Sequence, residues 1–285
     1  MSGAAIRRIA VLGAGTMGHG IAHAAMSAGY DTRLYDVTPS ALDRARAAIE
    51  SILSKGVELG RVPSADAPAT LARLRTTDKL EEALADADFI IEAAPERIDL
   101  KLALLAEVER VSPAGAVIAS NTSALSVTEL AGSLQQPSRV AGMHFFNPVH
   151  KMKLIEVVRA LDTSEHTLQT IQEVSARMGK ETVLVRESPG FITTRINASI
   201  GNEAFYMLME GVASAHDIDK ALKLGLNHPM GPFELVDLVG LDTRLSILEY
   251  LHRSMGEKYR PCPLLVQYVK AGRLGKKVGR GVYEY

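Results

Sequence analysis

An apolar run that ends in a glycine-rich turn constrains the start of this chain more than any other feature. In RRIAVLGAGTMGHGIAHAAMSAGY the apolar residues 9–12 precede the turn, and Ile21, Ala25 and Ala28 follow it at helical spacing. A strand, a tight turn and a helix are therefore predicted in that order. The turn fits G-x-G-x-x-G, which is a weak signal alone and an informative one between a strand and a helix.

The positions of this turn suit the binding of a dinucleotide. Gly13 permits the tight turn, Gly15 lets a pyrophosphate approach the backbone, and Gly18 lets helix and strand pack closely. Thr16 and Met17 lie at the N-terminus of the predicted helix, where free N–H groups and a partial positive charge favour phosphate. We predict a cofactor site at these five residues. The alternative is a glycine turn required only by packing.

An aspartate follows the next predicted strand, DTRLYD, and indicates which dinucleotide binds. The carboxylate of Asp36 can accept hydrogen bonds from both ribose hydroxyls. Its charge would repel a 2′-phosphate. The sequence therefore predicts NAD as the cofactor in preference to NADP.

Apolar runs alternate with helical patterns through the first two thirds of the chain. The later runs are FIIEAA at 89–94, AVIAS at 116–120, VAGMHFF at 140–146 and LIEVV at 154–158. This alternation predicts a Rossmann-type, doubly wound parallel α/β sheet over residues 1–187. After Ser188-Pro189-Gly190 the apolar residues recur only at helical spacing, so an all-α C-terminal domain is predicted for 188–285.

Composition excludes several classes of protein. With 285 residues, of which 47% are hydrophobic and 23% charged, the chain can form two globular domains of moderate size. A net charge of −1 gives no basic field for nucleic acid or an anionic membrane. The N-terminal apolar run is too short for a signal peptide or a membrane span. The single Cys262 cannot form an intrachain disulfide, so we expect a soluble, cytoplasmic protein.

Two ionisable residues interrupt the apolar runs of MHFFNPVHKMKLIEVV. His144 lies where one run ends, and Glu156 lies inside the next. A buried charge is costly unless it is paired and hydrogen-bonded. The two residues therefore either satisfy each other structurally or form a working acid-base pair, and this segment alone leaves both interpretations open.

A second pair of histidines, His19 and His23, has the i,i+4 spacing that places both on one helical face. That spacing can ligate a metal, but the sequence offers no third ligand. We interpret the pair as part of a solvated helix face, and no metal site is predicted.

Seven motifs together resemble the L-3-hydroxyacyl-CoA dehydrogenases, especially the short bacterial 3-hydroxybutyryl-CoA dehydrogenases. The resemblance covers essentially the whole chain, in order. Besides the glycine turn, the motifs are IIEAAPE (90–96), SNTSALSVTELA (120–131), HFFNPVHKMKLIEVV (144–158), SPGFITTR (188–195), HPMGPFELVDLVGLD (228–242) and GKKVGRGVYEY (275–285). Several are specific to that family, which favours the acid-base interpretation of His144 and Glu156.

The resemblance implies catalytic roles for His144, Glu156, Ser123 and Thr194, and a cofactor contact for Asn121. His144 would be the general base that removes the proton of the substrate β-hydroxyl, since an imidazole titrates near neutral pH. Glu156 would accept a hydrogen bond from its other ring nitrogen, as carboxylates do in catalytic triads. Ser123 would hydrogen-bond the substrate oxygen, and Asn121 would lie near the nicotinamide ribose.

The resemblance also implies positions that bind cofactor and substrate. Glu96 and Lys101 match positions on the cofactor side of the cleft. Lys55 matches a region that meets the CoA phosphates, and Asn147 is predicted to contact substrate. Each is also the kind of residue that commonly remains on a solvated surface.

The chain departs from the family pattern at one position. Most members carry an asparagine where this chain has Thr194, and that amide helps to position the substrate. Threonine has a shorter reach and no amide fork. Either Thr194 itself or Asn197, one helical turn further on, replaces the amide, or neither touches the substrate and Thr194 only packs or bonds back to its helix.

The resemblance implies NAD-dependent, reversible oxidation of a short-chain L-3-hydroxyacyl-CoA to the 3-ketoacyl-CoA. The ligand would lie in a cleft between the domains, and the C-terminal domain would form a homodimer. One alternative is a β-hydroxyacid dehydrogenase that acts on a free acid. The other is a non-catalytic dinucleotide-binding structural or sensor protein.

Overall fold

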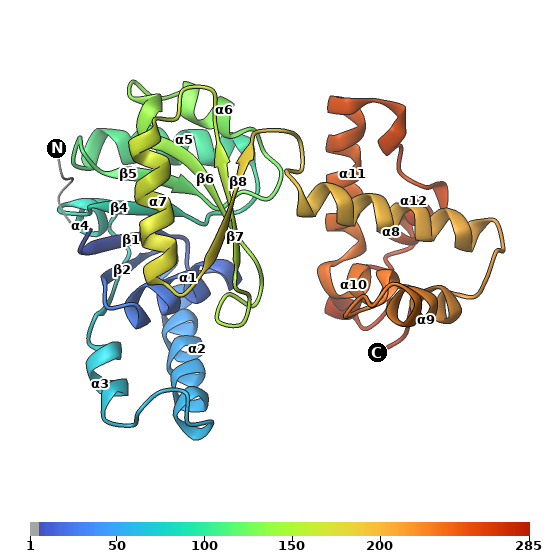
Figure 1. Cartoon of the computed structure of the whole chain (residues 1–285), viewed down its shortest axis with the longest axis horizontal. Helices are drawn as coiled ribbons and strands as arrows, with labels where there is room; N and C mark the ends of the chain where they lie inside the picture. Colours follow the sequence, from blue (N-terminus) through green and yellow to red (C-terminus); the bar gives the residue numbers. More distant parts are fainter. Residues whose placement is uncertain (1–5) are drawn as a thin grey trace. The chain divides into compact units, whose positions relative to one another are not determined.

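A mostly parallel sheet forms the framework of the first of two units. The computed structural model describes residues 6–285, and the chain divides into a unit that ends at Glu187 and a unit of Ser188–Tyr285 (Figure 1). Among the described residues, eight strands lie in the order β3-β2-β1-β4-β5-β6-β7-β8. They are β1 (Arg8–Leu12), β2 (Asp31–Tyr35), β3 (Leu74–Thr77), β4 (Phe89–Glu92), β5 (Val117–Ser120), β6 (Val140–Phe145), β7 (Leu154–Arg159) and β8 (Glu181–Arg186).

The central strands are buried on both faces, as parallel strands covered by helices are. Every residue of β4, β5 and β6 is buried. Helices α1, α2 and α7 pack on one face, and α7 crosses the front of the sheet in Figure 1. Helices α4 and α6 contact β2, β3 and β6, and α5 packs between these two helices. The helices are α1 (Thr16–Ser27), α2 (Pro39–Glu58), α3 (Asp66–Leu71), α4 (Leu80–Leu84), α5 (Ile98–Val111), α6 (Val127–Gly132) and α7 (Glu165–Arg177).

The predicted Rossmann-type sheet is confirmed, with two strands, β7 and β8, that run opposite to the others. β7 pairs with β6 antiparallel, and β8 then runs parallel to β7. The sequence pattern missed β3, in which only Leu74 is buried, and β8, in which Val183 and Leu184 remain 38% and 50% exposed. Both are edge strands in which most side chains are at least partly exposed, so neither shows a clear apolar alternation.

The second unit is helical, as predicted. Its core joins apolar residues of all five helices, and the rings of Phe205 and Phe233 meet edge to face with centroids 5.2 Å apart. Apart from isolated bridges at Gly275, Arg280 and Glu284, residues 188–285 contain no β structure. The helices are α8 (Thr193–Met209), α9 (Ala215–Gly225), α10 (Pro232–Val239), α11 (Leu241–Met255) and α12 (Pro263–Lys270).

Two buried aspartates hold the C-terminal segment against this helical core. Asp237 accepts hydrogen bonds from the backbone N–H groups of Val282 and Tyr283 at 2.8 and 2.9 Å. The hydroxyl of Tyr283 donates to Asp219 at 2.7 Å.

Across residues 6–285, no helix is long and apolar enough to cross a membrane.

Candidate active site

A cavity of about 350 Å³ opens where β1, β2, β4 and β5 end. The order of the strands reverses between β1 and β4, and open α/β sheets bind ligands at such a point, beyond the carboxyl ends of the strands. The residues that line the cavity are Gly13, Gly15, Thr16, Met17, Asp36, Ala93, Ala94, Pro95, Glu96, Asn121 and Ser123. Eight of them are predicted site residues, and Gly18 lies buried just behind them in α1.

The three glycines of the turn differ in what surrounds them. Gly13 has φ +105°, and a Cβ there would lie 2.7 Å from the carbonyl oxygen of Ala93. A Cβ at Gly18 would lie 1.7 Å from the carbonyl oxygen of Gly13, whereas one at Gly15 would meet nothing within 4 Å. The protein itself thus requires Gly13 and Gly18, while Gly15 keeps space open in front of α1.

The N-terminus of α1 has the chemistry that a pyrophosphate needs. Its N-cap is Gly15, which has no side chain to bond the N–H groups of the first turn. The first turn also contains no acidic residue. The helix dipole and the N–H groups therefore favour an anion here, so the residues present fit the diphosphate of a dinucleotide.

Asp36 is fixed at the end of β2 by the backbone. One carboxylate oxygen accepts a hydrogen bond from the N–H of Ala14 at 2.8 Å, and the other accepts one from Thr38 at 2.9 Å. The side chain is half-buried and lines the cavity. These bonds hold a negative charge beside the glycine turn, where it suits ribose hydroxyls and opposes a 2′-phosphate.

Glu96 and Lys101 occupy different depths of the cavity wall. Glu96 lines the cavity, and its Oε1 accepts hydrogen bonds from Thr122 Oγ1 at 2.7 Å and from the N–H of Ser123 at 2.8 Å. Lys101 is fully buried behind the wall, and its Nζ lies 2.6 Å from Glu92 Oε1. The partner Glu92 was not identified from the sequence, although it interrupts the apolar run FIIEAA as Glu156 interrupts LIEVV.

Asn121 links the cavity to the strand that carries His144. Its Oδ1 accepts a hydrogen bond from the N–H of Phe145 at 2.9 Å. Asn121 and the half-buried Ser123 both line the cavity. The loop after β5 therefore contacts the nucleotide cavity on one side and the end of β6 on the other.

His144 and Glu156 lie directly opposite each other on the antiparallel strands β6 and β7. His144 Nδ1 is 2.7 Å from Glu156 Oε2, and the two residues are 6% and 0% exposed. A carboxylate only accepts hydrogen bonds, so Nδ1 carries the proton and Nε2 is the basic nitrogen. The imidazole is thus held in the tautomer that a general base needs.

A second cavity, of about 490 Å³, lies beside the end of α2. Lys55 lines it, together with two cations that the sequence did not single out, Arg61 and Lys151. Both stand in loops, where sequence spacing gives no sign that they meet. Apolar side chains of Ile52, Leu59 and Val62 complete the wall.

Asn147 is exposed in the loop that follows β6, and its bond to Pro148 is cis.

The two histidines of α1 differ in their surroundings. His19 Nδ1 lies 3.0 Å from the carbonyl oxygen of Gly15. Burial, together with the nearby His150, lowers the pKa of His23 to about 4, and its Nδ1 has no hydrogen-bond partner. In residues 6–285, no group of three His, Cys, Asp or Glu side chains could hold a metal ion.

Thr194 and Asn197 lie in the helical unit, in the first two turns of α8. Both side chains are half-buried. Between them, Arg195 Nε donates to the hydroxyl of Tyr259 at 2.7 Å and so ties this part of α8 to the core of its own unit. The two candidate residues for the family asparagine therefore stand on a fixed helix.

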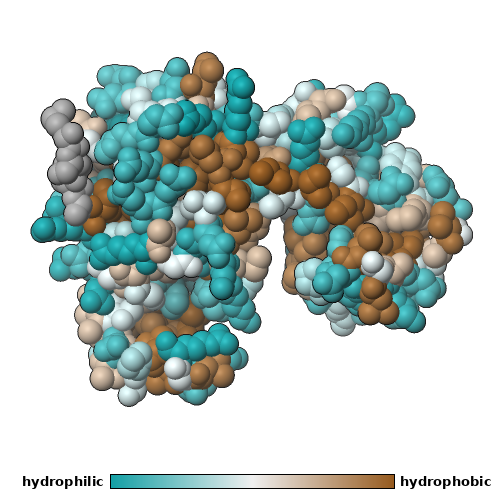
Figure 2. Space-filling view, in the orientation of Figure 1, coloured by the Kyte–Doolittle hydropathy of each residue, from teal (hydrophilic) through white to brown (hydrophobic). Residues whose placement is uncertain are grey.

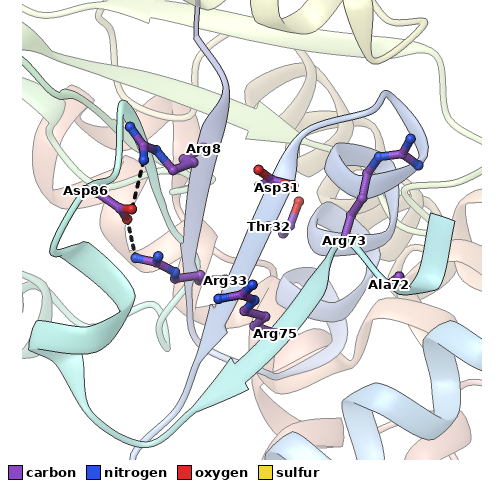
Figure 3. Close-up of a pocket in the computed structure, with 8 residues that line it drawn as sticks. All are labelled: Arg8, Asp31, Thr32, Arg33, Ala72, Arg73, Arg75 and Asp86. Atoms are coloured by element: carbon purple, nitrogen blue, oxygen red, sulfur yellow. Dashed lines mark hydrogen bonds and ion pairs between the residues drawn. The ribbon is translucent and has the colours of Figure 1, made fainter. Parts of the chain in front are cut away.

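A further cavity, of about 200 Å³, lies among the first residues of β1, β2 and β3 and has a different character (Figure 3). Arginine side chains dominate its lining, and Asp86 pairs with both Arg8 and Arg33. It lies at the amino ends of the strands, away from the glycine turn. The arginine-lined cavity in Figure 3 therefore does not belong to the nucleotide site.

A dinucleotide cavity that shares its sheet with a carboxylate-oriented histidine is the arrangement of an NAD-dependent dehydrogenase. Comparisons with known proteins agree. Residues 8–188 match the model of the 3-hydroxyacyl-CoA dehydrogenase NAD binding domain, and residues 190–285 match that of the C-terminal domain. The chain belongs to the 3-hydroxyacyl-CoA dehydrogenase family.

Close relatives are similar over nearly their whole length. A probable 3-hydroxybutyryl-CoA dehydrogenase of Bacillus subtilis (strain 168) is 46% identical over 98% of each chain. A 3-hydroxybutyryl-CoA dehydrogenase of Bradyrhizobium diazoefficiens is 44% identical over 99% of this chain and 96% of the relative. The crystal structure of (S)-3-hydroxybutyryl-CoA dehydrogenase PaaH1 from Ralstonia eutropha superposes with a TM-score of 0.95, at 41% identity over 99% of each chain.

Proposed function

We propose that this enzyme oxidises short-chain L-3-hydroxyacyl-CoA thioesters, with 3-hydroxybutyryl-CoA as the best substrate, to 3-ketoacyl-CoA in a reversible reaction. The buried pair of His144 and Glu156 carries the proposal, because it supplies an oriented base on the sheet that also forms the nucleotide cavity. The names of the relatives support the substrate class.

His144 acts as the general base. Its Nδ1 proton stays on the hydrogen bond to Glu156, and Nε2 takes the proton of the substrate β-hydroxyl. NAD, when bound, supplies the hydride acceptor. The charge of Glu156 stabilises the imidazolium that forms, in a buried site where charge pairing is stronger than in water. In the reverse direction the same nitrogen returns the proton to the keto oxygen.

Residues of the loop after β5 position the reacting groups. The Ser123 hydroxyl donates a hydrogen bond to the substrate oxygen, and its backbone is held by Glu96. Asn121, whose Oδ1 is taken by the N–H of Phe145, offers its amide nitrogen to the nicotinamide ribose. On α8, Thr194 or Asn197 replaces the family asparagine and contacts the substrate.

The cavity beside α2 binds the CoA part of the substrate. Lys55, Arg61 and Lys151 place three cations around it, which suits the CoA phosphates. Its apolar wall suits the adenine ring. Asn147, in the exposed loop after His144, contacts the chain of the substrate. A thioester of CoA would pair its phosphates with these cations, whereas a free hydroxy acid would leave the cations without a role.

Mixing the protein with NAD and 3-hydroxybutyryl-CoA tests the proposal. We expect NADH absorbance to rise at a rate proportional to enzyme concentration, and His144→Gln to abolish most of that rate. Free 3-hydroxybutyrate should give at most a small rate. A faster rate with the free acid would indicate a β-hydroxyacid dehydrogenase, and NADH binding without turnover of either compound would indicate a structural or sensor protein.

Exposed apolar side chains on the helical unit support a proposal about assembly. Ile196 of α8 remains 57% exposed and Met209 44% exposed, and hydrophobic surface is visible on the helical unit in Figure 2. We propose that this unit forms a homodimer. A monomeric mass by light scattering at micromolar concentration, with activity retained, would contradict it.

The single buried Cys262 fits a reducing compartment, and we propose the cytoplasm.

A further inference from the structure

A fully buried carboxylate, Glu92, lies at the end of β4 between the two loops that line the nucleotide cavity. Its Oε1 accepts hydrogen bonds from the N–H of Ala94 and from Lys101 Nζ, both at 2.6 Å. Its Oε2 accepts one from Ser120 Oγ at 2.5 Å. Three donors therefore satisfy this carboxylate, and one of them is an ammonium group that is also 0% exposed.

The partners of Glu92 belong to two walls of the cavity, which follow the neighbouring strands β4 and β5. Ala94 is part of the wall that follows β4, whereas Ser120 immediately precedes Asn121 in the wall that follows β5. The backbone carbonyl of Glu92 also accepts a hydrogen bond from the N–H of Asn121 at 2.7 Å. One residue thus sets the spacing between the two walls.

Lys101 extends this connection to the loop that carries Ser123. Its Nζ donates to the carbonyl oxygen of Ala94 at 3.2 Å and lies 3.6 Å from Glu96 Oε2. The other oxygen of Glu96 holds Ser123 through its backbone N–H. The buried ammonium therefore lies between two carboxylates, each of which fixes a different part of the β5 loop.

We propose that Glu92 is a positioning residue for the cofactor: through Lys101 and Ser120 it holds the two walls of the nucleotide cavity at the separation that NAD requires. Glu92 lies beneath the wall and contributes no group to the cavity lining. The inference rests on the proposal that Glu96, Asn121 and Ser123 line the working site.

The variant Glu92→Gln keeps the shape of the side chain and removes the charge. Its amide oxygen can still face Ala94, but Lys101 loses its nearest carboxylate, so the wall is expected to shift. Removing the outer partners of metal ligands typically costs about 10- to 100-fold in affinity, and we expect the lower end here, about a tenfold rise in the Kd for NADH. At saturating NAD, kcat should stay within about threefold of wild type, because His144 and Glu156 are untouched.

A double variant separates positioning from stability. Glu92→Gln with Lys101→Met replaces the ion pair by neutral groups of similar size, which commonly restores stability. We therefore expect Tm to recover towards wild type. The Kd for NADH should stay raised, because methionine cannot donate a hydrogen bond to the carbonyl of Ala94. Glu107→Gln, which removes a carboxylate from an exposed pair with Arg110 on the same helix, is the matched control and should change neither quantity.

The measurement is a fluorescence titration with NADH, alongside thermal melting and steady-state kinetics. If Glu92→Gln lowers Tm but binds NADH within twofold of wild type, the residue only stabilises the fold and the proposal is overturned. If that variant does not fold, Ser120→Ala, which deletes only the hydrogen bond from Ser120 Oγ to Glu92, must still raise the Kd for NADH. Failure of the wild type itself to bind NADH would instead refute the proposed function.

Discussion

His144 Nδ1 and Glu156 Oε2 lie 2.7 Å apart across the only antiparallel strand pair in the described part of the sheet. Antiparallel pairing puts residues directly opposite each other, and the register His144↔Glu156 brings the two side chains to the same face. The reversal of β7 relative to β6 therefore brings these two residues into contact. It turns two isolated polar positions in apolar runs into one buried, oriented pair.

Removing either member of this pair should lower turnover. We expect His144→Gln to lower kcat by about 10² to 10⁴, the usual span for general acid-base catalysis, with little change in the Kd for NAD. Glu156→Gln should also lower kcat, because the imidazolium loses its supporting charge and the tautomer is no longer fixed. Single-turnover kinetics of NADH formation measures the chemical step directly.

The control for charge removal is Glu165→Gln. That carboxylate pairs with Arg159 at the surface and is 81% exposed, so kcat should be unchanged. Near wild-type rates for the chemical step in His144→Gln or Glu156→Gln would mean that the buried pair is structural only.

Asp36→Ala should alter cofactor choice. Loss of a charge-assisted hydrogen bond to ribose typically costs about 1.5 to 3 kcal/mol, so KM for NAD should rise while discrimination against NADP relaxes. Some of the change comes from the turn itself, because Asp36 also accepts the N–H of Ala14. Asp31→Ala, an exposed change at the start of the same strand, is the control. A wild-type enzyme that already uses NADP as well as NAD would exclude the assigned role.

Two glycine substitutions in one turn should behave oppositely. At Gly15 a methyl group meets no protein atom within 4 Å, so Gly15→Ala should fold with an unchanged Tm and bind NADH weakly. At Gly18 the methyl group would overlap the carbonyl of Gly13, so Gly18→Ala should destabilise the fold by about 1 to 3 kcal/mol or more. Thermal melting and NADH fluorescence distinguish the two. Wild-type NADH affinity in Gly15→Ala would place the phosphates elsewhere.

The sequence predicted what depends on local pattern. The strand, glycine turn and helix at residues 8–27 follow from apolar spacing, and so does the change to helices after residue 188. Ser126 and Ser214 are helix N-caps, and each accepts a hydrogen bond from the third residue of its helix. These features need only short stretches of chain, which is why one sequence suffices to find them.

Contacts between distant elements could not be predicted from the sequence. Lys101 was expected on the cofactor side of the cleft and is instead 0% exposed behind the wall, because its charge is paired with Glu92 from another element. Arg61 and Lys151 meet Lys55 only through the folding of two loops onto α2. The residue pairs concerned are separated along the chain and share no helical or strand periodicity, so no pattern in the sequence connects them.

The last prediction concerns Thr194, where the chain departs from its family. Thr194 and Asn197 are both half-buried and lie about one turn apart on α8. If the Thr194 hydroxyl makes the substrate contact, directly or through a water, Thr194→Val should cost about 1 to 3 kcal/mol in kcat/KM and Asn197→Ala should be mild. If Asn197 supplies the amide, the ranking reverses.

Threonine to valine keeps the shape of the side chain and deletes only the hydroxyl, so the comparison isolates one hydrogen bond. Ser199→Ala is the matched control on the same helix, because the Ser199 hydroxyl bonds back to the carbonyl of Arg195 at 3.0 Å. Steady-state kinetics with 3-hydroxybutyryl-CoA at saturating NAD gives the ranking. Wild-type kcat/KM in both Thr194→Val and Asn197→Ala would mean that neither residue replaces the family asparagine, and that Ser123 and His144 alone position the substrate.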